Sequence, residues 1–334
     1  MKLYNRLRFT ATIFMVILLA IASVSIGVDA VSAEIKLVYA SGELAGFSIS
    51  DYGPIVVGFD NTNDNVSPAE KAGIELGDVI LAIDGVNTQT IDQVKTRLIC
   101  AGDTIKLTCL RGGESMDIQV TIGDNKALGC WLKESFTGIG TITCYIPDED
   151  RIILLGHSVS DGGSIIPHVN TGSVYLAYFM SVKVGQVNNP GEIRACFDYS
   201  APTIANITSN TKFGLNAKTS DNISKYISLT KTELLDKHEV KTGNATILCD
   251  VDGNGPKEYR ITIESISLNK TEKNMVIQVL DKELLNITGG IVQGMSGSPI
   301  LQNGKLVGAV THVLVNDPTR GYGIFIENML DAAE

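Results

Sequence analysis

Short apolar runs separated by turn residues dominate this chain from Cys130 onward, and this pattern limits the fold more than any other feature. Each run has the length of a strand, and glycine, asparagine and proline punctuate the series. The runs are Gly140–Tyr145, Arg151–Leu155, Val174–Phe179, Thr246–Leu248, Tyr259–Ile266, Met275–Leu280 and Lys305–Thr311. Only Thr232–His238 and Lys282–Leu285 suggest helices. The pattern predicts a mainly β domain over residues 126–334, either a barrel or a sandwich.

The composition is that of an acidic globular protein. The chain has 334 residues, enough for two domains with cores of their own, and 44% of them are hydrophobic. Lys and Arg total 27 against 37 Asp and Glu, so the formal net charge is −10. A protein that neutralises phosphates needs clustered cations, and no basic face can be picked out here. We therefore expect no nucleic-acid partner.

No residue pattern indicates a metal or another cofactor. The four histidines are His157, His168, His238 and His312. None of them has the spacing of a zinc site. The string Asp250–Gly255 resembles the start of a calcium-binding EF-hand loop, but the twelfth position, which needs Glu, is Ile261. We expect a hairpin tip there, and neither a metal nor a cofactor.

Residues 1–33 have the features of a signal peptide or a membrane anchor. Lys2, Arg6 and Arg8 precede Phe9–Val28, an uncharged stretch of 20 residues that matches the hydrocarbon core of a bilayer. Val31–Ala33 offers small residues to a signal peptidase. With either fate the positive flank stays cytoplasmic and the rest is exported. Export permits disulfides, but the spacing of the six cysteines predicts none in particular, and we expect buried thiols.

The stretch before the β-rich region combines two helix starts with a strand and a tight turn. Ser67–Glu70 has a capping serine, a proline at the first helical position and a glutamate three residues after the cap. The strand Val79–Ile83 runs into Asp84-Gly85, which is typical of a type I′ hairpin turn. Thr90–Gln93 then repeats the capping box at the start of a second, amphipathic helix.

This order of elements, and the run Ser67–Gly85 in particular, resembles a PDZ domain of the bacterial protease-associated kind. We place that domain at residues 36–125. The resemblance implies that an extended peptide adds to a sheet edge. It also implies that Gly46, Phe47 and Ile49 lie in the loop that offers backbone N–H groups to the peptide carboxylate. The alternative is that this loop contains only turn residues.

One loop carries a candidate nucleophile. In Gly294–Ile300, glycines on both sides of Ser296 allow a bend that projects the hydroxyl and turns neighbouring N–H groups the same way. A serine hydroxyl is a poor nucleophile unless a base takes its proton. His157 follows an apolar strand 139 residues earlier and could serve as that base. Together the two residues predict a serine hydrolase.

These features are similar to those of chymotrypsin-like serine peptidases, and nearly the whole chain resembles the SpoIVB peptidase family. The resemblance rests on Gly138–Tyr145, Gly156–Asp161, Asn189–Glu192, Gly289–Ile300 and Gly308–Gly323. The order of anchor, PDZ domain and peptidase domain agrees as well. The resemblance implies a chymotrypsin-like β-barrel peptidase domain at residues 126–334 and the activity of a serine endopeptidase.

The resemblance also assigns roles. Ser296 would be the nucleophile and His157 the general base, with the backbone N–H groups of Gly294 and Ser296 forming the oxyanion hole. Asp281 matches the aspartate of the family pattern, 15 residues before Ser296, although it could equally cap the helix that follows it. Asp198 lies roughly where the chain order of chymotrypsin places the acid. We prefer Asp281 and keep Asp198 as the alternative.

One departure from the chymotrypsin pattern, and two alternatives, leave other hypotheses open. Met295 stands where chymotrypsin-like enzymes have the aspartate that settles the loop after zymogen cleavage, so activation needs another route. Self-cleavage near the N-terminal segment, or a peptide in the PDZ domain, would provide one. Lys305 as the base is disfavoured because it follows the Asn303-Gly304 turn and should point into water. A non-catalytic PDZ-bearing envelope adaptor is the alternative to an enzyme.

The family resemblance alone implies a pathway. A SpoIVB-type peptidase is made in the forespore and crosses into the space between the forespore and mother-cell membranes. There it cleaves a membrane-bound regulator of an intramembrane protease, and a sigma factor matures as a result. The expected partners are therefore a membrane-protein substrate and a peptide bound to the PDZ domain, which could be the protein's own N-terminal segment.

Overall fold

A computed structural model describes residues 37–60, 66–122, 125–162, 165–219 and 222–332. The predicted signal peptide or anchor, residues 1–33, lies outside these ranges. Within them, no helix is both long enough and apolar enough to cross a bilayer. Strands dominate the described chain, which confirms the mainly β prediction.

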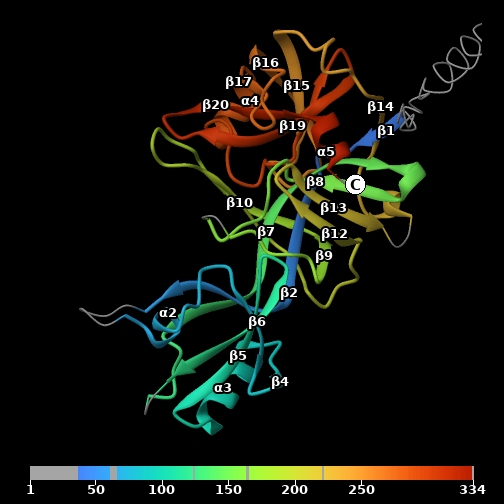
Figure 1. Ribbon diagram of the computed structural model, residues 1–334. Coiled ribbons are helices and arrows are strands. Elements are labelled where there is room, and N and C mark those ends of the chain that lie inside the picture. Colours follow the sequence, from blue (N-terminus) through green and yellow to red (C-terminus); the bar gives the residue numbers. More distant parts are fainter. Residues whose placement is uncertain (1–36, 61–65, 123–124, 163–164, 220–221, 333–334) are drawn as a thin grey trace, which may run out of the picture. The chain divides into compact units, whose positions relative to one another are not determined.

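Six strands close the first barrel (Figure 1). Their order around it is β2 (Leu44–Phe59), β7 (Cys130–Ile146), β8 (Arg151–Leu154), β13 (Gly214–Thr219), β12 (Ala205–Thr211) and β9 (Thr171–Leu176). The ring closes because β2 pairs with β7 along one edge and with β9 along the other. β1 (Leu37–Ala40) and β14 (Thr230–Glu233) extend the sheet beside β7.

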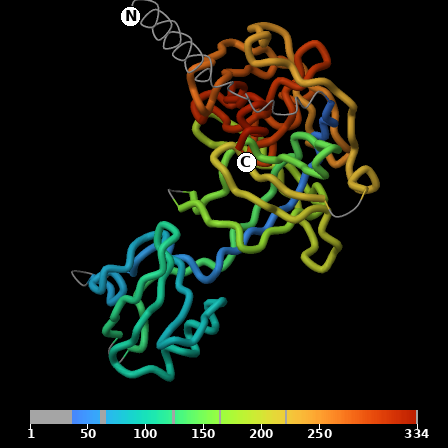
Figure 2. The backbone as a smooth tube through the Cα atoms, turned by 45° about the vertical axis from the view of Figure 1, so that its right-hand side comes forward, coloured from blue at the N-terminus to red at the C-terminus, as the bar shows by residue number. Residues whose placement is uncertain are grey.

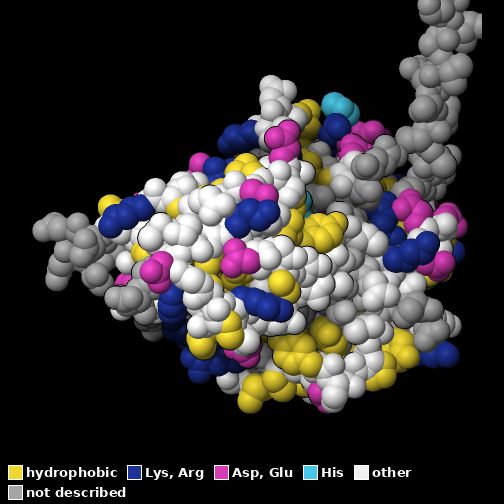
Figure 3. Space-filling view, turned by 60° about the horizontal axis from the view of Figure 1, so that its bottom comes forward, with side chains coloured by type: hydrophobic (Ala, Val, Ile, Leu, Met, Phe, Trp, Pro, Cys, Tyr) yellow, Lys and Arg dark blue, Asp and Glu magenta, His cyan; other side chains and the backbone are white. Residues whose placement is uncertain are grey.

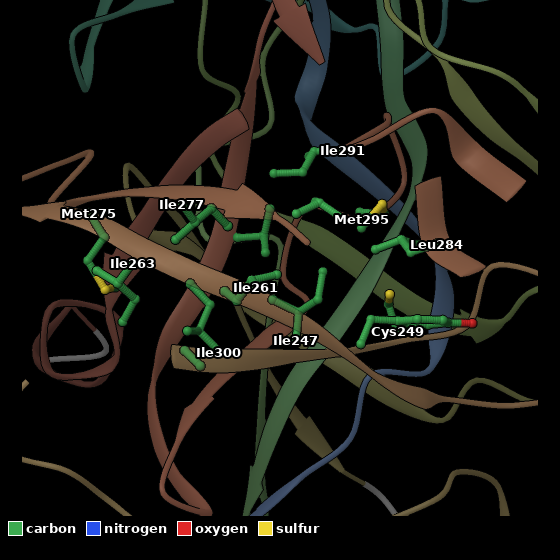
Figure 4. Packing of buried hydrophobic residues seen from close by; sticks show 14 of the residues in the cluster. Ile247, Cys249, Ile261, Ile263, Met275, Ile277, Leu284, Ile291, Met295 and Ile300 are labelled. Carbon is green, nitrogen blue, oxygen red and sulfur yellow. The ribbon is translucent and has the colours of Figure 1, made fainter. Parts of the chain in front are cut away.

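The second barrel is also closed and has six strands. Their order is β15 (Gly243–Cys249), β16 (Lys257–Ile266), β17 (Met275–Val279), β20 (Asp317–Phe325), β19 (Lys305–Leu314) and β18 (Pro299–Gln302). The helix α4 (Lys282–Thr288) joins β17 to β18, and α5 (Ile326–Asp331) follows β20. Figure 4 shows Ile261, Ile277, Ile300 and Met295 within the core of this barrel, where each is at most 1% exposed.

The PDZ domain is inserted between the first two strands of the first barrel. The chain enters it through β2 and leaves it through β7 (Figure 2). Its remaining elements are α2 (Pro68–Lys71), β3 (Val79–Ile83), β4 (Val86–Asn87), α3 (Ile91–Cys100), β5 (Thr104–Arg111) and β6 (Glu114–Thr121). It has a core of its own, to which Ile80, Val94 and Leu107 contribute.

The local signals of the PDZ domain form as the sequence predicts. The Ser67 hydroxyl accepts a hydrogen bond from the N–H of Glu70, and Thr90 and Gln93 form both halves of a capping box. Asp84 and Gly85 both have positive φ, 50° and 77°, as a type I′ turn requires. These interactions join residues no more than three positions apart, so local sequence determines them.

The predicted PDZ boundary and peptide-binding loop are wrong. Gly46, Phe47 and Ile49 lie within β2, where their backbones pair with β7 on one side and β9 on the other. Phe47 and Ile49 point into the first barrel, at 6% and 0% exposure. Because these backbone groups already belong to a barrel strand, they cannot receive a peptide carboxylate. β1 and the first half of β2 therefore belong to the peptidase fold.

Two more differences arise from long-range pairing. The predicted helix Thr232–His238 is instead the end of β14 followed by turns, because Leu234 bridges Leu306 and the Thr232 hydroxyl donates to the Gly304 carbonyl over 2.7 Å. The hairpin of β10 (Tyr178–Lys183) and β11 (Glu192–Cys196), which sequence analysis missed in part, lies between β9 and β12 in the chain.

The predicted hairpin tip and thiols take ordinary structural roles. Asp250 lies in the turn between β15 and β16, where one carboxylate oxygen accepts the N–H groups of Asp252 and Gly253. All six cysteines are free thiols. Cys109, Cys144 and Cys249 are buried as expected, whereas Cys130 is half-buried and Cys100 and Cys196 are exposed. On the face shown in Figure 3, lysine and arginine side chains are interspersed with aspartate and glutamate side chains.

Candidate active site

Two glycines shape the loop that carries Ser296. Gly294 and Gly297 have φ values of +96° and +97°, which side chains other than glycine rarely adopt. A Cβ at Gly297 would lie 2.1 Å from the carbonyl oxygen of Thr141. Met295 between them is fully buried in the second barrel and anchors the loop there. The loop thus presents the partly exposed Ser296 in a conformation that its flanking residues determine.

The first barrel holds this loop through two buried threonines of β7. The Thr141 hydroxyl donates to the carbonyl of Gly294 and the Thr143 hydroxyl to that of Gly297, both over 2.7 Å. The backbone N–H of Thr141 also donates to the carbonyl of Ser296 over 2.9 Å. The run Gly138–Tyr145 contains both threonines, but local sequence does not reveal this role, because the partners are more than 150 residues apart.

Thr311 and His312 connect the serine loop with His157. The Ser296 hydroxyl donates to the carbonyl of Thr311 over 2.7 Å. The next residue, His312, lies against His157 with ring centroids 4.8 Å apart. At Gly156, which has a φ of +72°, a Cβ would lie 3.1 Å from the Thr311 side chain. The structure therefore places the predicted base and nucleophile on loops that meet around Thr311 and His312.

His157 has the tautomer that a general base needs. Its Nδ1 lies 2.9 Å from the carbonyl oxygen of Ser158, which can only accept, so Nδ1 carries the proton and Nε2 is free to accept one. Desolvation lowers the pKa of His157 below its ordinary value, and the bond to Ser158 offsets this in part. The imidazole is consequently neutral at pH 7 and can take a proton.

The lowered pKa of His157 predicts the pH dependence of the reaction. Activity requires the neutral imidazole, so the acidic limb of kcat/KM should have its midpoint below pH 6.5, the ordinary value. Replacing His312 by Ala removes a ring that shields His157 from water, so the midpoint should rise towards 6.5. We would measure kcat/KM from roughly pH 4 to 8 for both proteins. An unchanged midpoint in H312A would show that this ring does not desolvate the base.

Two backbone N–H groups are left for an oxyanion. Among the residues that the structure describes, the N–H groups of Gly294 and Ser296 donate to no protein acceptor, whereas those of Met295, Gly297 and Ser298 do. Preorganised donors of this kind stabilise the charge that develops on a carbonyl oxygen during nucleophilic attack, and each contributes about 3 kcal/mol to lowering the barrier. Gly294 and Ser296 are the residues for which the chymotrypsin analogy predicts that role.

The structure places Asp281 at the start of α4, where its partners are groups other than His157. Its carboxylate caps α4 by accepting the N–H groups of Glu283 and Leu284, and it lies 3.5 Å from the Arg260 guanidinium. Burial alone would raise the pKa of Asp281. Hydrogen bonds from backbone N–H groups, of which that of Arg260 has the largest effect, outweigh burial and lower the pKa. Within the described chain, none of its hydrogen bonds or ion pairs reaches His157.

Asp198, the alternative acid, lies in an exposed turn. One of its oxygens accepts both the N–H and the hydroxyl of Ser200, and these bonds lower the pKa of Asp198. It makes no hydrogen bond to His157 in the described structure. Asp161, four residues after His157, accepts the N–H of Ile165 and so caps its own loop. The carbonyl of Ser158 therefore occupies the place at Nδ1 that an aspartate takes in a triad.

Substitutions at Asp281 separate a cap from a catalytic acid. D281N keeps a good N-cap, so activity should stay within about threefold of the wild type. D281A removes the cap and should lower the free energy of unfolding by about 1 kcal/mol. Steady-state kinetics and urea unfolding check both expectations. A loss of several orders of magnitude in kcat for well-folded D281N would restore Asp281 as the acid.

Asn210 on β12 supports the base and was missed by sequence analysis. Its side chain accepts the N–H of Val159 over 2.9 Å and donates to the Val159 carbonyl over 3.0 Å. This pair of bonds fixes the backbone next to Ser158, whose carbonyl orients His157. Only a contact across the barrel reveals the role, because an asparagine on a strand carries no local signal.

Lys305, the other candidate base, is engaged elsewhere. Its Nζ lies 2.9 Å from the carboxylate of Glu233. This partner raises the pKa of Lys305, so the amine stays protonated and cannot accept a proton.

A serine on a glycine-shaped loop, a neutral histidine and two unpaired N–H groups, held between two six-stranded barrels, define a chymotrypsin-like serine peptidase. Comparison with protein families agrees. Residues 124–330, more than half of the chain, match the model of the SpoIVB peptidase S55 family, and residues 66–111 match the PDZ domain. The chain belongs to the SpoIVB peptidase S55 family and is a serine endopeptidase with a PDZ domain.

Solved structures give only distant likenesses. The inactive form of Rv3671c from M. tuberculosis aligns with a TM-score of 0.31 and 14% identity, over 58% of this chain and 80% of that one. The HtrA-type protease AlgW with a decapeptide aligns with a TM-score of 0.35 and 12% identity, over 88% of this chain and 63% of AlgW. Deg5 aligns with a TM-score of 0.33 and 13% identity, over 58% of this chain and 80% of Deg5. No curated protein matches the chain.

Proposed function

We propose that this protein is an exported serine endopeptidase of sporulation signalling, and that it cleaves a membrane-bound regulator of an intramembrane protease. The family match supports the substrate class and the pathway. The observation that supports the chemistry is that Ser296 contacts Thr311 and His157 contacts the next residue, His312, beside two N–H groups that have no protein acceptor in the described structure.

In the proposed reaction, His157 acts first as base and then as acid. The Ser296 hydroxyl exchanges the Thr311 carbonyl for Nε2 of His157 and attacks the substrate carbonyl carbon as its proton moves to Nε2. The N–H groups of Gly294 and Ser296 bind the oxyanion. The protonated imidazole then gives the proton to the leaving amine, and water hydrolyses the acyl-enzyme with His157 again as base.

We also propose the compartment and the second partner from the family match. The peptidase would work in the space between the forespore and mother-cell membranes, delivered there by residues 1–33. Its PDZ domain would bind an extended peptide, either from a substrate or from the protein's own N-terminal segment. Because the buried Met295 replaces the aspartate that settles the nucleophile loop in chymotrypsin-like enzymes, activation needs another route. Peptide binding to the PDZ domain, or self-cleavage, would provide it.

The substrate assignment can be tested with purified components. The wild-type chain and S296A would each be incubated with the extracytoplasmic part of a candidate membrane-bound regulator, and the products would be identified by mass spectrometry. We expect defined cleavage by the wild type only. Binding of the regulator without cleavage by either protein would favour the non-catalytic adaptor, and cleavage of unrelated unfolded proteins at equal rates would argue against a dedicated regulator.

A further inference from the structure

The hairpin of β10 and β11 leaves the first barrel and bonds to the segment just before the nucleophile. The N–H of Gly185 donates to the Thr288 carbonyl over 2.8 Å, and the N–H of Ile193 donates to the Gln293 carbonyl over 2.8 Å. The N–H of Gln293 donates back to the carbonyl of Gly191 over 3.0 Å. Gln293 thus has both of its backbone groups bonded to this hairpin.

These bonds bear directly on the first oxyanion donor. The Gln293 carbonyl and the Gly294 N–H belong to one planar trans peptide group, in which the two bonds point in opposite directions. Because the carbonyl is bonded to Ile193, the N–H of Gly294 must point away from the hairpin. A flip of this peptide would lose the bond to Ile193 and turn the donor away from an oxyanion.

Side chains also pack tightly where the hairpin meets the serine loop. Ile193 is 2% exposed, and its Cβ lies 3.0 Å from where a Cβ of Gly294 would be. A Cβ at Gly191 would lie 2.5 Å from both the N–H of Gly185 and the carbonyl of Lys183. It would also lie 2.6 Å from Val292, which is itself 2% exposed. The hairpin and the loop are therefore in close contact, with no room for an added methyl group.

The hairpin tip also reaches the other segment beside the site. The N–H of Asn188 donates over 2.7 Å to the carbonyl of Val315, three residues after His312. One hairpin thus bonds to the backbone on both sides of the reaction centre. The run Asn189–Glu192, which contributes to the family resemblance, forms the end of the connecting loop and the first residue of β11.

We propose that the β10–β11 hairpin sets the oxyanion hole, with Ile193 and Gly191 as positioning residues that aim the N–H of Gly294. This inference rests on the proposed roles of Ser296 and Gly294. In chymotrypsin-like enzymes an aspartate just before the nucleophile holds the loop in place. This chain has the buried Met295 at that position, and the hairpin takes over the aspartate's role.

The test uses the full chain and a fluorescent fluorophosphonate, whose phosphoryl oxygen occupies the oxyanion hole as Ser296 is modified. I193P removes the donor to Gln293, and G191A forces the hairpin and the loop apart. We expect the maximal rate of labelling to fall about 100-fold in each, with the half-saturating probe concentration within about threefold of the wild type. The conservative I193V keeps the N–H and should label at the wild-type rate.

Controls separate positioning from folding and from the proposed function itself. G102A adds a methyl group where the nearest atom is 3.9 Å away, so it should match the wild type in labelling rate and in Tm. Wild-type labelling rates in folded I193P and G191A would overturn the inference. A labelling loss in I193V, or one that follows Tm in all variants, would reduce the hairpin to a structural role. Persistent labelling of S296A would instead overturn the proposed nucleophile.

Discussion

Replacing Ser296 by Ala should reduce peptide-bond cleavage by roughly 10⁶-fold, the loss seen when a serine peptidase loses its nucleophile. The hydroxyl makes one hydrogen bond, to the Thr311 carbonyl, and the conformation of the loop depends on Gly294, Met295 and Gly297 rather than on this side chain. The variant should therefore fold normally and still bind substrate. Single-turnover cleavage of a peptide substrate, together with the Tm, measures both expectations.

Ser298 provides a matched control in the same loop. It is fully buried, and in the described structure the only group that its hydroxyl interacts with is the buried Cys249 thiol, with no hydrogen bond of ordinary geometry. S298A should keep kcat within about threefold of the wild type and should change stability little, since the buried hydroxyl that it removes has only a weak thiol partner. If S298A lost activity and S296A retained it, the nucleophile would be the second serine of the loop.

Replacing His157 by Ala should lower kcat by a similar factor, roughly 10⁴- to 10⁶-fold. Without this imidazole the serine proton has no good acceptor, because Lys305 is protonated by its pairing with Glu233. The neighbouring ring of His312 is a weak base, since burial lowers the pKa of His312 to about 4. Because nucleophile and base act as one unit, the double variant H157A/S296A should be little worse than S296A alone. Kinetics of the three variants test this non-additivity.

His168 serves as the control for the base. It lies on the loop that follows His157, its side chain is 61% exposed, and its contacts are with Asp51. H168A should therefore cleave at nearly the wild-type rate. Equal losses in H157A and H168A would mean that the loop as a whole, and not one imidazole, supports activity.

The features that sequence analysis predicted correctly are those that depend on close neighbours in the chain. The caps at Ser67 and Thr90, the turn at Asp84 and the strand Val79–Ile83 follow from residues a few positions apart. The bend around Ser296 also follows from its adjacent glycines. The fold class was accessible for the same reason, since strand length and turn residues are local properties.

The features that sequence analysis missed depend on distant partners. Gly46, Phe47 and Ile49 alternate as strand residues do in any sheet, and only pairing with β7 and β9 assigns them to a barrel. An aspartate before a short helix can cap the helix or orient a histidine, so the residues around Asp281 could not distinguish these roles. The two β7 threonines and Asn210 have their functions through contacts across the fold.

The central claim is that Ser296, activated by His157, is the residue that forms the covalent intermediate. The most direct test is to label the wild-type chain with a fluorophosphonate, digest it and locate the adduct by mass spectrometry, with H157A treated in parallel. We predict one adduct, on Ser296, in the wild type and almost none in H157A. An adduct on another residue, or equal labelling of both proteins, would contradict it.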